Sequence, residues 1–434
     1  MHVVVGLGVT GLSCVQYLKQ RGESVTLMDA HVNPPLKAQC LDDLDGVTCY
    51  FGGMDAAVLA DATRIIVSPG VRLDDAAFTL ARQRQVPIVS DMQLFAEAIQ
   101  KPIYAVTGSN GKTTLVTLLG MMADQSGLSV SVAGNIGTPV LSVLAVESSA
   151  YVLECSSFQL DVTPCLSARA ACIMNVSPDH LDRHGTMAAY IEAKQKIYTG
   201  CDVAVHNLDD PSTAPFCHFS NHQVTFSLHS LKADYRVSGG QLFGFGRSLM
   251  RVDQLAQSGQ HHVSNALCAL AMGTTMGCDP AAMVAVLRQF SGLPHRMQWV
   301  RTHLGVRWVN DSKATNIGAS QAAIKSLRPN IAGRLWLIAG GDAKGADFAN
   351  YAAEVVPLLA GVVLIGRDQL KMAAALGSSI AIYCADSLSE AVYTMARLAH
   401  SGDAVLLSPA CASQDMFLNY EDRGDQFMQL VHSL

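Results

Sequence analysis

The sequence predicts an α/β protein made of three successive α/β units. Three observations predict this class. Strand and helix patterns alternate through most of the 434 residues, a glycine-rich turn follows the first predicted strand, and a second glycine-rich turn follows the apolar run 102–106. Strands that alternate with helices are typical of parallel sheets. We predict domain boundaries that give the segments 1–90, 91–293 and 294–434.

The composition is that of a folded protein with a large core. Half of the residues are apolar, 15% are charged, and the formal net charge is −6. This charge argues against nucleic acid or an anionic membrane as the main partner. Twelve cysteines without a CxxC pair favour free thiols in a reducing compartment. The chain opens without a signal-peptide pattern and has no apolar stretch of bilayer length, so we expect a cytoplasmic protein that does not insert into membranes.

The first unit contains a GxGxxG turn at residues 6–11, between a predicted strand (2–5) and a predicted helix (9–21). Asp29 ends the next predicted strand (24–28), which completes the dinucleotide-binding pattern. The pattern predicts a ligand with a diphosphate and a ribose, and Asp29 would accept a hydrogen bond from a hydroxyl group of the ribose. The glycines do not distinguish NAD from another nucleotide diphosphate, and a tight turn without a ligand is the alternative. A strand at 64–67, a helix at 75–84 and a strand at 86–89 complete this unit.

The second unit contains the stretch TGSNGKTT at residues 107–114, between a strand and a helix. Gly108 and Gly111 allow a tight turn whose N–H groups can face a phosphate, Lys112 brings a positive charge, and Thr113 offers a hydroxyl to Mg²⁺. Val106 stands where the usual phosphate loop has its first glycine. The loop is therefore a shortened variant of the common motif.

Two acidic motifs follow other predicted strands of the second unit. Glu154 ends the apolar strand 151–153, where a carboxylate can hold Mg²⁺ beside a phosphate loop, although an ordinary strand-end glutamate is the alternative. Residues 175–182, with Asp179, His180 and Asp182, follow the strand 171–174. The carboxyl ends of parallel strands are where α/β proteins bind ligands, but Asp179 could also simply cap the next segment.

The rest of the second unit is less distinctive. Residues 190–198 predict a helix on which Lys194 reads as part of a solvated face. The run 203–250 has short strand-like stretches rich in Gly, Ser and His, which predict antiparallel structure. Helices at 263–276 and 280–290 close the unit, and a Gly-Leu-Pro linker follows.

The third unit returns to alternating strands and helices. Three polar loops follow its strands, with Lys313 after the strand 306–309, Lys344 after 335–339 and Ser413 after 404–407. Together these loops could form one anion-binding site through the lysines and helix N-termini. The predicted helices are 351–360, 367–376 and 387–399, and further strands are predicted at 361–365 and 380–384.

Taken together, the motifs resemble the Mur ligases of peptidoglycan synthesis. The matching pieces span the chain in family order: TGSNGKTT, LECSSFQ (153–159), NVSPDHLD (175–182), HVSNA (262–266), LPHR (293–296) and NDSKATN (310–316). The N-terminal GxGxxG, the stretch GGDAKGADF and the stretch SPACASQDMFLNYEDRG resemble the branch that adds D-glutamate. The Asp-Asn-Pro-Arg motif of the diaminopimelate-adding branch is missing from the sequence.

The resemblance implies two Rossmann-like domains that flank a central ATPase domain of the P-loop type. It implies the substrates UDP-N-acetylmuramoyl-L-alanine, D-glutamate and ATP, with Mg²⁺ at two sites, in a monomeric cytoplasmic enzyme. It assigns the N-terminal glycine turn to the uridine diphosphate of the substrate and not to NAD. The residues that would contact this nucleotide substrate are Val9, Thr10, Gly11, Asp29, Gly70 and Asn135.

The resemblance also implies roles at the other sites. Lys112, His180, Lys194 and Lys313 would take part in catalysis. ATP would be bound by Gly108, Ser109, Asn110, Gly111, Lys112, Thr113, Thr114, Asn265, Arg296 and Asp311. D-Glutamate would be bound by Thr315, Lys344, Ser413 and Tyr420, and metal by Thr113, Glu154, His180 and a carbamylated Lys194. Carbamylation would turn the ammonium group of Lys194 into a carboxylate-like ligand.

A few positions differ from the usual family pattern. Ala30 and His31 stand where relatives often have Thr-Arg, Gln414 replaces an apolar residue, and Tyr420 replaces Phe. These differences concern the fine contacts to uracil and D-glutamate.

Two other functions remain open on the residues alone. An NAD-dependent dehydrogenase would use the GxGxxG turn and Asp29, but it would leave the phosphate loop, Glu154 and His180 without a role. A non-catalytic ATP-binding module would bind ATP without forming ADP in response to an amino acid. Both alternatives differ from a ligase in the products that an assay would detect.

Overall fold

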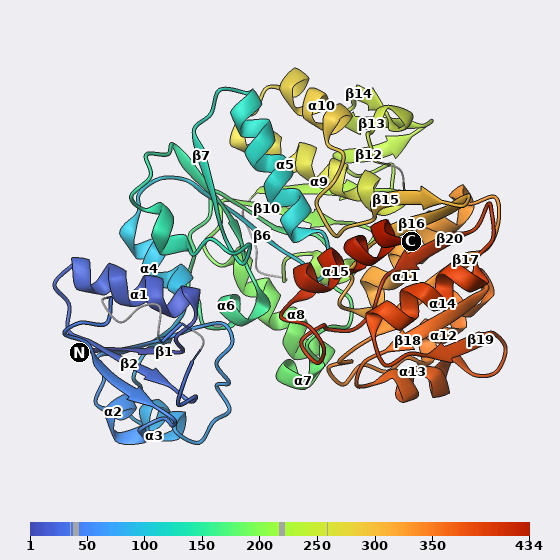
Figure 1. Cartoon of the computed structure of the whole chain (residues 1–434). Helices are drawn as coiled ribbons and strands as arrows, with labels where there is room; N and C mark the ends of the chain where they lie inside the picture. The colour runs from blue at the N-terminus through green and yellow to red at the C-terminus, as the bar shows by residue number, and fades with distance from the viewer. Residues whose placement is uncertain (35, 38–42, 217–221, 258) are drawn as a thin grey trace. The chain divides into compact units, whose positions relative to one another are not determined.

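The computed structural model describes residues 1–434 except 35, 38–42, 217–221 and 258. The described residues divide into two compact units. Figure 1 labels the helices and strands of the chain and colours them by residue number. Unit 1 comprises Met1–Val176, Ala188–Arg251 and Asn265–Leu287, and unit 2 comprises Ser177–Met187, Val252–Ser264 and Arg288–Leu434. The predicted α/β class is confirmed, since three sheets are present and the central one carries the phosphate loop.

The N-terminal sheet is a fully parallel five-stranded sheet in the order β3-β2-β1-β4-β5. Helices connect β1 to β2, β3 to β4 and β4 to β5, as the βα alternation of the sequence predicts, and such connections allow neighbouring strands to be parallel. Its strands are β1 (His2–Val5), β2 (Val25–Asp29), β3 (Thr48–Phe51), β4 (Arg64–Val67) and β5 (Ile88–Val89), and its helices are α1 (Val9–Gln20), α2 (Ala56–Ala60) and α3 (Phe78–Gln83).

The central sheet has nine strands in the order β14-β13-β12-β11-β10-β9-β6-β8-β7. Its strands are β6 (Ile103–Thr107), β7 (Val130–Gly134), β8 (Ala150–Glu154), β9 (Ala170–Ile173), β10 (Val203–Asn207), β11 (His222–Ser227), β12 (Tyr235–Ser238), β13 (Gln241–Gly244) and β14 (Arg247–Arg251). Strand β6, which leads into the phosphate loop, lies between β8 and β9. The carboxyl ends of β6, β8 and β9 therefore meet at one edge of the sheet.

Helices precede, separate or follow these strands along the chain. They are α4 (Asp91–Ala98), α5 (Lys112–Gln125), α6 (Ser157–Asp161), α7 (Leu181–His184), α8 (Met187–Gln195), α9 (Gln260–Met276) and α10 (Pro280–Gln289). The prediction of antiparallel structure for 203–250 is wrong for its first half, because β10 pairs in parallel with both β9 and β11. It holds for β12, β13 and β14, which form an antiparallel meander. Residues 217–221 of this run lie outside the described residues.

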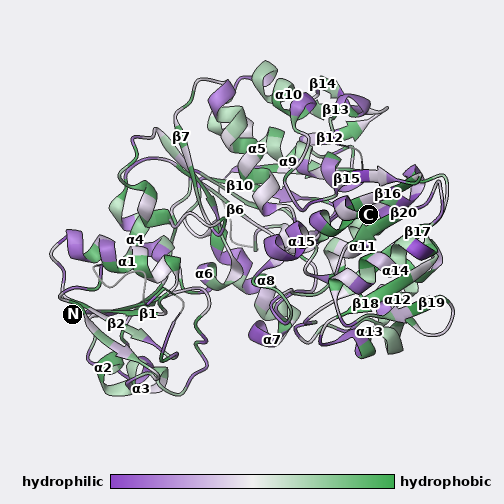
Figure 2. Cartoon of the chain, viewed as in Figure 1, coloured by the Kyte–Doolittle hydropathy of each residue, from purple (hydrophilic) through white to green (hydrophobic). Residues whose placement is uncertain are grey.

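The C-terminal sheet has six strands in the order β15-β16-β20-β17-β18-β19, and only β15 is antiparallel to its neighbour. Alternate residues of β17 face two different cores, with Leu335 and Leu337 on one face and Trp336 and Ile338 on the other. Figure 2 shows the strands of this sheet mainly in the hydrophobic colour, as expected for strands covered on both faces.

The strands of this sheet are β15 (Gln298–His303), β16 (Val306–Asn310), β17 (Leu335–Gly340), β18 (Gly361–Ile365), β19 (Ala381–Cys384) and β20 (Ala404–Leu407). Its helices are α11 (Ile317–Leu327), α12 (Ala349–Val355), α13 (Gln369–Leu376), α14 (Leu388–Leu398) and α15 (Tyr420–Ser433). Short 3₁₀ helices lie at Val140–Val143, Lys196–Tyr198, Pro211–Thr213, Val252–Gln254, Arg328–Asn330 and Val356–Leu358.

Two further expectations concern the thiols and the membrane. The ten cysteines that the structure describes are all free, and seven of them are buried, as expected for thiols kept in apolar surroundings. Among the described residues, no helix combines the length and the apolar character that crossing a bilayer requires.

Candidate functional site

The phosphate loop connects the end of β6 to the start of α5, as predicted. Gly108 and Gly111 have φ angles of 155° and 85°, which favour glycine. The loop is fixed by Asn175 at the end of β9: Ser109 N–H donates to its carbonyl (2.9 Å), and Asn110 N–H donates to its side-chain oxygen (2.9 Å). The loop backbone is therefore held at the carboxyl edge of the sheet, and the N-terminus of α5 follows it directly.

Gly111 is also required by its neighbours. A Cβ atom at this position would lie 2.8 Å from Oδ1 of Asn265 and 2.9 Å from Cε of Met174. The structure thus brings the side chain of Asn265, from α9, against the loop. This agrees with the prediction that Asn265 belongs to the same site, although the two residues are far apart in sequence.

Two lysines converge on one carbonyl of the loop. The Nζ atom of Lys112 donates to the carbonyls of Gly108 (2.8 Å) and Ser109 (2.9 Å). The Nζ atom of Lys194, on α8, donates to the same Gly108 carbonyl (2.9 Å) and lies 4.6 Å from the ring centroid of Tyr190. Lys194 is 2% exposed, so reading it as part of a solvated helix face is wrong. Two ammonium groups on one oxygen repel each other, and burial weakens the screening between them.

Glu154 ends β8 at the same edge and is 2% exposed. One carboxylate oxygen accepts from Nδ2 of Asn135 (3.1 Å), while the other, Oε2, is buried and has no hydrogen-bond partner. Leaving a buried oxygen unpaired is costly, and such an atom is a natural ligand for a cation. The described residues contain no group of three His, Cys, Asp or Glu side chains placed to hold a metal, so Glu154 could supply only part of a coordination shell.

The N-terminal glycine turn lies between β1 and α1, and Val9 and Thr10 form the first turn of that helix. A Cβ atom at Gly11 would lie 1.8 Å from the carbonyl oxygen of Gly6, so glycine is required at this position. The carboxylate of Asp29 accepts from Leu7 N–H (2.7 Å) and from His31 N–H (2.8 Å).

Asp29 therefore braces the turn itself, which the sequence pattern alone did not indicate. Burial by itself would raise the pKa of Asp29, but the hydrogen bonds from Leu7 and His31 outweigh it and lower the pKa. Gly70 lies exposed in the turn after β4.

In unit 2, Asp311 follows β16 and is 7% exposed. Its carboxylate accepts from Oγ of Ser408 (2.8 Å) and from Met297 N–H (3.1 Å). Burial raises the pKa of Asp311 to about 7, against the lowering effect of these hydrogen bonds and of Arg296 and Arg423. This carboxyl group is thus poised to change its charge near neutral pH.

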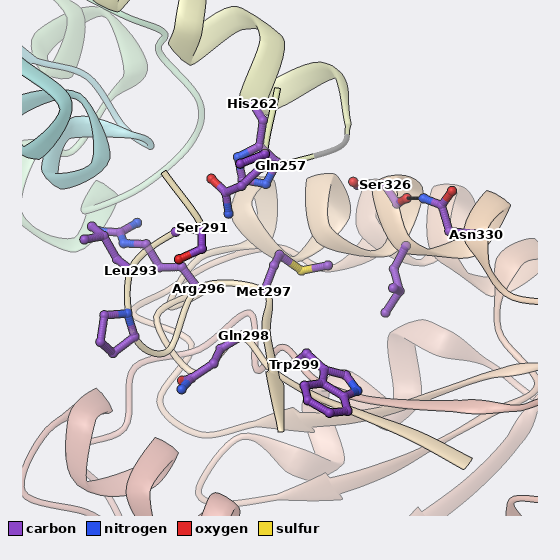
Figure 3. A pocket seen from close by; sticks show the side chains of 14 residues that line it. Gln257, His262, Ser291, Leu293, Arg296, Met297, Gln298, Trp299, Ser326 and Asn330 are labelled. Atoms are coloured by element: carbon purple, nitrogen blue, oxygen red, sulfur yellow. Dashed lines mark hydrogen bonds between the residues drawn. The ribbon is translucent and has the colours of Figure 1, made fainter. Parts of the chain in front are cut away.

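A cavity of about 510 Å³ lies in the same unit and contains Arg296, one of the predicted ATP contacts. Figure 3 shows Gln257 and His262 on one side of the cavity and Gln298 and Trp299 on the other. Burial lowers the pKa of His262 to about 3, which keeps its imidazole neutral. A cavity that combines one guanidinium, a neutral imidazole and an indole suits a planar ligand that carries an anionic group.

The predicted D-glutamate contacts lie on the loops after β16, β17 and β20. The ammonium group of Lys313 lies 3.7 Å from the ring centroid of Tyr420. Lys344 lies with its Nζ atom 3.8 Å from Oδ1 of Asp179, whose other oxygen accepts from Nδ2 of Asn316 (3.1 Å). Asp179 therefore contacts two of the polar loops and does more than cap its own segment.

The remaining predicted residues of these loops are close in sequence to the ones above. Thr315 N–H donates to the carbonyl of Lys313 (2.8 Å), and Ser413 is 4% exposed. His180 belongs to unit 2 and Glu154 to unit 1, so a shared metal site remains a prediction. His180 has a φ angle of 55° and its N–H donates to its neighbour Asp179 (2.9 Å).

Sequence reasoning missed Arg423, which is fully buried. Its guanidinium donates to the Oγ and carbonyl oxygen of Ser312 (2.9 and 2.8 Å) and to the carbonyls of Cys411 (3.3 Å) and Ala412 (3.4 Å). It thereby holds together the loops that carry Lys313 and Ser413. Its place in a polar stretch of the sequence gave no signal of burial.

The matches to protein families agree with this architecture. Residues 1–90 match the Mur ligase MurD-like N-terminal domain, residues 106–273 match the Mur ligase middle domain, and residues 295–411 match the Mur ligase glutamate ligase domain. The fold is that of this class of protein, and the chain belongs to the Mur ligase family.

Individual proteins within this family are similar to the chain over its full length. The UDP-N-acetylmuramoylalanine–D-glutamate ligase of Marinobacter nauticus is 45% identical over 440 residues, which cover 100% of this chain and 98% of that protein. The proteins of the same name from Nitrosococcus oceani and Pseudomonas syringae are 42% and 44% identical over 438 and 441 residues, and they cover 100% of this chain and 96% and 98% of their own lengths.

Solved structures show the same fold at low identity. A pseudomurein peptide ligase type C from Methanothermus fervidus has a TM-score of 0.65 at 17% identity, with 100% of this chain and 99% of that chain covered. The MurF ligase of Thermotoga maritima in complex with ADP has a TM-score of 0.62 at 18% identity, with 95% and 96% covered. The alternative of an NAD-dependent dehydrogenase finds no support, because the N-terminal glycine turn lies within the MurD-like domain.

Proposed function

We propose that the chain joins D-glutamate to the carboxyl group of UDP-N-acetylmuramoyl-L-alanine, with cleavage of ATP to ADP and phosphate. The observation that carries this proposal is the full-length similarity to ligases of that name, at 42–45% identity. Catalysis of this reaction would use the buried side chains of Glu154 and Lys194 beside the phosphate loop. A non-catalytic ATP-binding module would not require them.

The ATP phosphates would bind at the loop Gly108–Thr114, where backbone N–H groups and the N-terminus of α5 favour anions. The ammonium group of Lys112, now on two loop carbonyls, would move to the phosphates, since an anion attracts it more strongly than a carbonyl does. Asn265 would contact the nucleotide beside Gly111. Arg296 and Asp311 would contribute from unit 2, Arg296 from the cavity of Figure 3.

Magnesium would be held by Glu154 and Thr113, with His180 as a further ligand. The unpartnered Oε2 atom of Glu154 supports this assignment, because carboxylate oxygen is a preferred ligand of Mg²⁺. When bound, the metal would offset negative charge on the transferring phosphoryl group. The residues of the chain position the carboxylate: Asn135 fixes one of its oxygens and leaves the other available.

A second metal would need another anionic ligand, and we propose a carbamylated Lys194 for that role. The support is electrostatic: the ammonium groups of Lys112 and Lys194 share the Gly108 carbonyl. Carbamylation reverses the charge of Lys194, so it replaces repulsion from Lys112 by attraction.

The nucleotide substrate would lie on the glycine turn of the N-terminal domain. Its diphosphate would meet the N-terminus of α1 at Val9, Thr10 and Gly11. Asp29 and Gly70 would complete the contacts from the ends of β2 and β4. Asn135 would take part from the central domain.

D-Glutamate would lie among the loops of Thr315, Lys344, Ser413 and Tyr420. Its carboxylates would be attracted by Lys344 and by Lys313, and the buried Arg423 would keep the loops in place. The negative charge of Asp179 beside Lys344 suits the amino group of the same molecule.

The reaction would take place in two steps. The L-alanyl carboxylate attacks the γ-phosphorus of ATP, so that ADP leaves and an acyl phosphate forms. The amine of D-glutamate then attacks the acyl carbon, and the tetrahedral intermediate expels phosphate while the amide bond forms. Since water would hydrolyse an acyl phosphate, closure of the domains around the site is expected.

We also propose the domain organisation, the oligomeric state and the location of the enzyme. The domain boundaries are 1–90, 91–293 and 294–434. The enzyme would act as a monomer, as the resemblance to the family implies. It works in the cytoplasm, where ATP and the nucleotide substrate are available.

A phosphate-release assay tests the function. With UDP-N-acetylmuramoyl-L-alanine and ATP, D-glutamate should give ADP and phosphate in equal amounts, whereas L-glutamate and D-aspartate should give little. Lys112→Ala should lower the rate by at least about 10²-fold, since it removes a charge that offsets the transferring phosphoryl group. Lys101→Ala, which removes an ammonium group bonded to Ser148, is the matched control. Turnover with reduced nicotinamide, or wild-type rates in Lys112→Ala, would overturn the assignment.

A further inference from the structure

Asp91 is a buried carboxylate for which the proposed reaction has no role. It is the first residue of α4 and is 1% exposed. No cation is among the groups that shift its pKa, which burial raises to about 6. A buried carboxylate without a cationic partner lowers stability at neutral pH. Its presence therefore needs a reason other than folding stability.

The carboxylate of Asp91 faces the side-chain amide of Gln159. Nε2 of Gln159 lies 3.1 and 3.4 Å from the two carboxylate oxygens of Asp91. The other end of the same amide, Oε1, accepts from the N–H (3.2 Å) and the Oγ (3.0 Å) of Ser156. Because Ser156 fixes the oxygen end, the nitrogen end must face Asp91, and the amide cannot flip.

The side-chain amide of Gln159 links the N-terminus of α6 to the N-terminus of α4 within unit 1. Ser156 caps α6 two residues after Glu154, the proposed metal ligand. Asp91 begins the predicted central domain, directly after Ser90. Ser90 is itself tied to the end of α6, since its N–H donates to Val162 (3.0 Å) and its Oγ lies 2.6 Å from Oγ1 of Thr163.

We infer that Asp91 is a positioning residue, which acts through Gln159 to fix the junction between the nucleotide-substrate domain and the strand end that carries Glu154. The inference rests on the proposed function. It predicts that Asp91 affects the binding of the nucleotide substrate more than that of ATP, because Ser90 and Asp91 follow the domain that would hold the uridine diphosphate.

Substitutions can exchange the hydrogen-bond donor and acceptor of the contact between Asp91 and Gln159. Nε2 of Gln159 lies within 3.4 Å of both carboxylate oxygens of Asp91, so a donor faces whichever oxygen is replaced. In Asp91→Asn, one amide N–H group must therefore face another donor. In Gln159→Glu, two carboxylates face each other. In the double variant, the introduced asparagine can donate to the introduced glutamate, whose second oxygen still accepts from Ser156.

The test is a double-mutant cycle on the full-length chain, read out as KM for the nucleotide substrate and for ATP in the phosphate-release assay. Each single variant should raise KM for UDP-N-acetylmuramoyl-L-alanine about tenfold and leave KM for ATP within about twofold of wild type. The double variant should restore the first KM to within about threefold. Asp124→Asn, which changes an exposed carboxylate on α5, is the control and should leave both constants unchanged.

Three results would overturn the inference: single variants with unchanged KM values, KM values for both substrates that rise together, or a double variant that is not restored. If a single variant does not fold, the double variant still decides, since restored folding with a normal KM supports the contact and an impaired double variant refutes it. Wild-type enzyme is assayed in parallel. If it releases no phosphate with D-glutamate, the proposed function fails, independently of Asp91.

Discussion

The ammonium group of Lys313 lies 3.7 Å from the ring centroid of Tyr420, so the loop after β16 and the start of α15 are joined by a cation–π contact. Both residues belong to the proposed D-glutamate site. The contact depends on the ring and not on the hydroxyl group of the tyrosine. The aromatic ring alone can therefore support Lys313, with or without the hydroxyl group.

Tyr420→Phe should keep near-wild-type activity, because the ring over Lys313 is retained. Tyr420→Ala should raise KM for D-glutamate by about 2- to 30-fold, which corresponds to the roughly 0.5–2 kcal/mol of a cation–π contact. Steady-state kinetics with varied D-glutamate measure both. Tyr393→Ala, which removes an exposed tyrosine on α14, is the control. Equal losses in Tyr420→Phe and Tyr420→Ala would show that the hydroxyl group, and not the ring, matters.

Lys194→Ala should lose most activity, since it removes the side chain that would be carbamylated. A short carboxylate such as formate or acetate should restore part of the rate, because it can fill the space and supply the missing negative charge. The measurement is phosphate release with increasing carboxylate. Lys196→Ala, which removes a partly exposed lysine paired with Asp161, should need no rescue. A fully active Lys194→Ala enzyme without any carboxylate would end the carbamate hypothesis.

Gly11→Ala should weaken the N-terminal domain, because the added Cβ would lie 1.8 Å from the carbonyl oxygen of Gly6. We expect a loss of about 1–3 kcal/mol in unfolding free energy, the usual cost of forcing atoms into a packed site, and a higher KM for the nucleotide substrate. Gly8→Ala is the matched control in the same turn, since a Cβ atom there meets nothing within 4 Å. Chemical denaturation of both variants measures the difference, and equal stabilities would contradict the geometry.

The raised pKa of Asp311 predicts how the free energy of unfolding changes with pH. Burial raises its pKa from 3.8 to about 7 in the folded chain, so between these values the folded state binds a proton that the unfolded state has lost. The stability that the protonated Asp311 contributes to the folded chain is fully present below pH 3.8 and is lost as the pH rises through about 7. A single group of this kind lowers the unfolding free energy by at most about 1.4 kcal/mol per pH unit.

Asp311→Asn should therefore reduce the loss of stability between about pH 4 and pH 7. Asp91 also has a raised pKa, of about 6, so part of the slope should remain. Denaturation curves at several pH values measure the slope. An unchanged slope in Asp311→Asn would show that this carboxyl group is already ionised in the folded chain throughout the range.

The sequence was sufficient for features that depend on local pattern. The strands that end at Thr107, Glu154 and Asn310 were predicted because an apolar run stops at a polar or glycine turn, and the structure has β6, β8 and β16 there. The direction of β10 and β11 was predicted wrongly, because it depends on pairing with β9, which is distant in sequence. Short runs rich in Gly and Ser are typical of antiparallel hairpins, so they predict antiparallel strands when the pairing with a distant strand is unknown.

The sequence likewise predicted only those site residues that lie in local motifs. Lys112 and Glu154 lie in local motifs, whereas the role of Lys194 depends on burial that a helix pattern does not reveal. Arg423 and Asp91 were missed, since their burial results from loops and helices that come together only in the folded chain. A single charged residue in a polar stretch looks the same in sequence whether it is exposed or holds two loops.

The most direct test of the proposed reaction follows an oxygen atom. If the L-alanyl carboxylate of UDP-N-acetylmuramoyl-L-alanine attacks ATP, one of its oxygens must leave with the phosphate when D-glutamate replaces it. With ¹⁸O in that carboxylate, mass spectrometry of the released phosphate should find one labelled oxygen in each molecule, and the amide product should keep the other. Phosphate without the label would contradict the acyl-phosphate reaction and the function proposed for this chain.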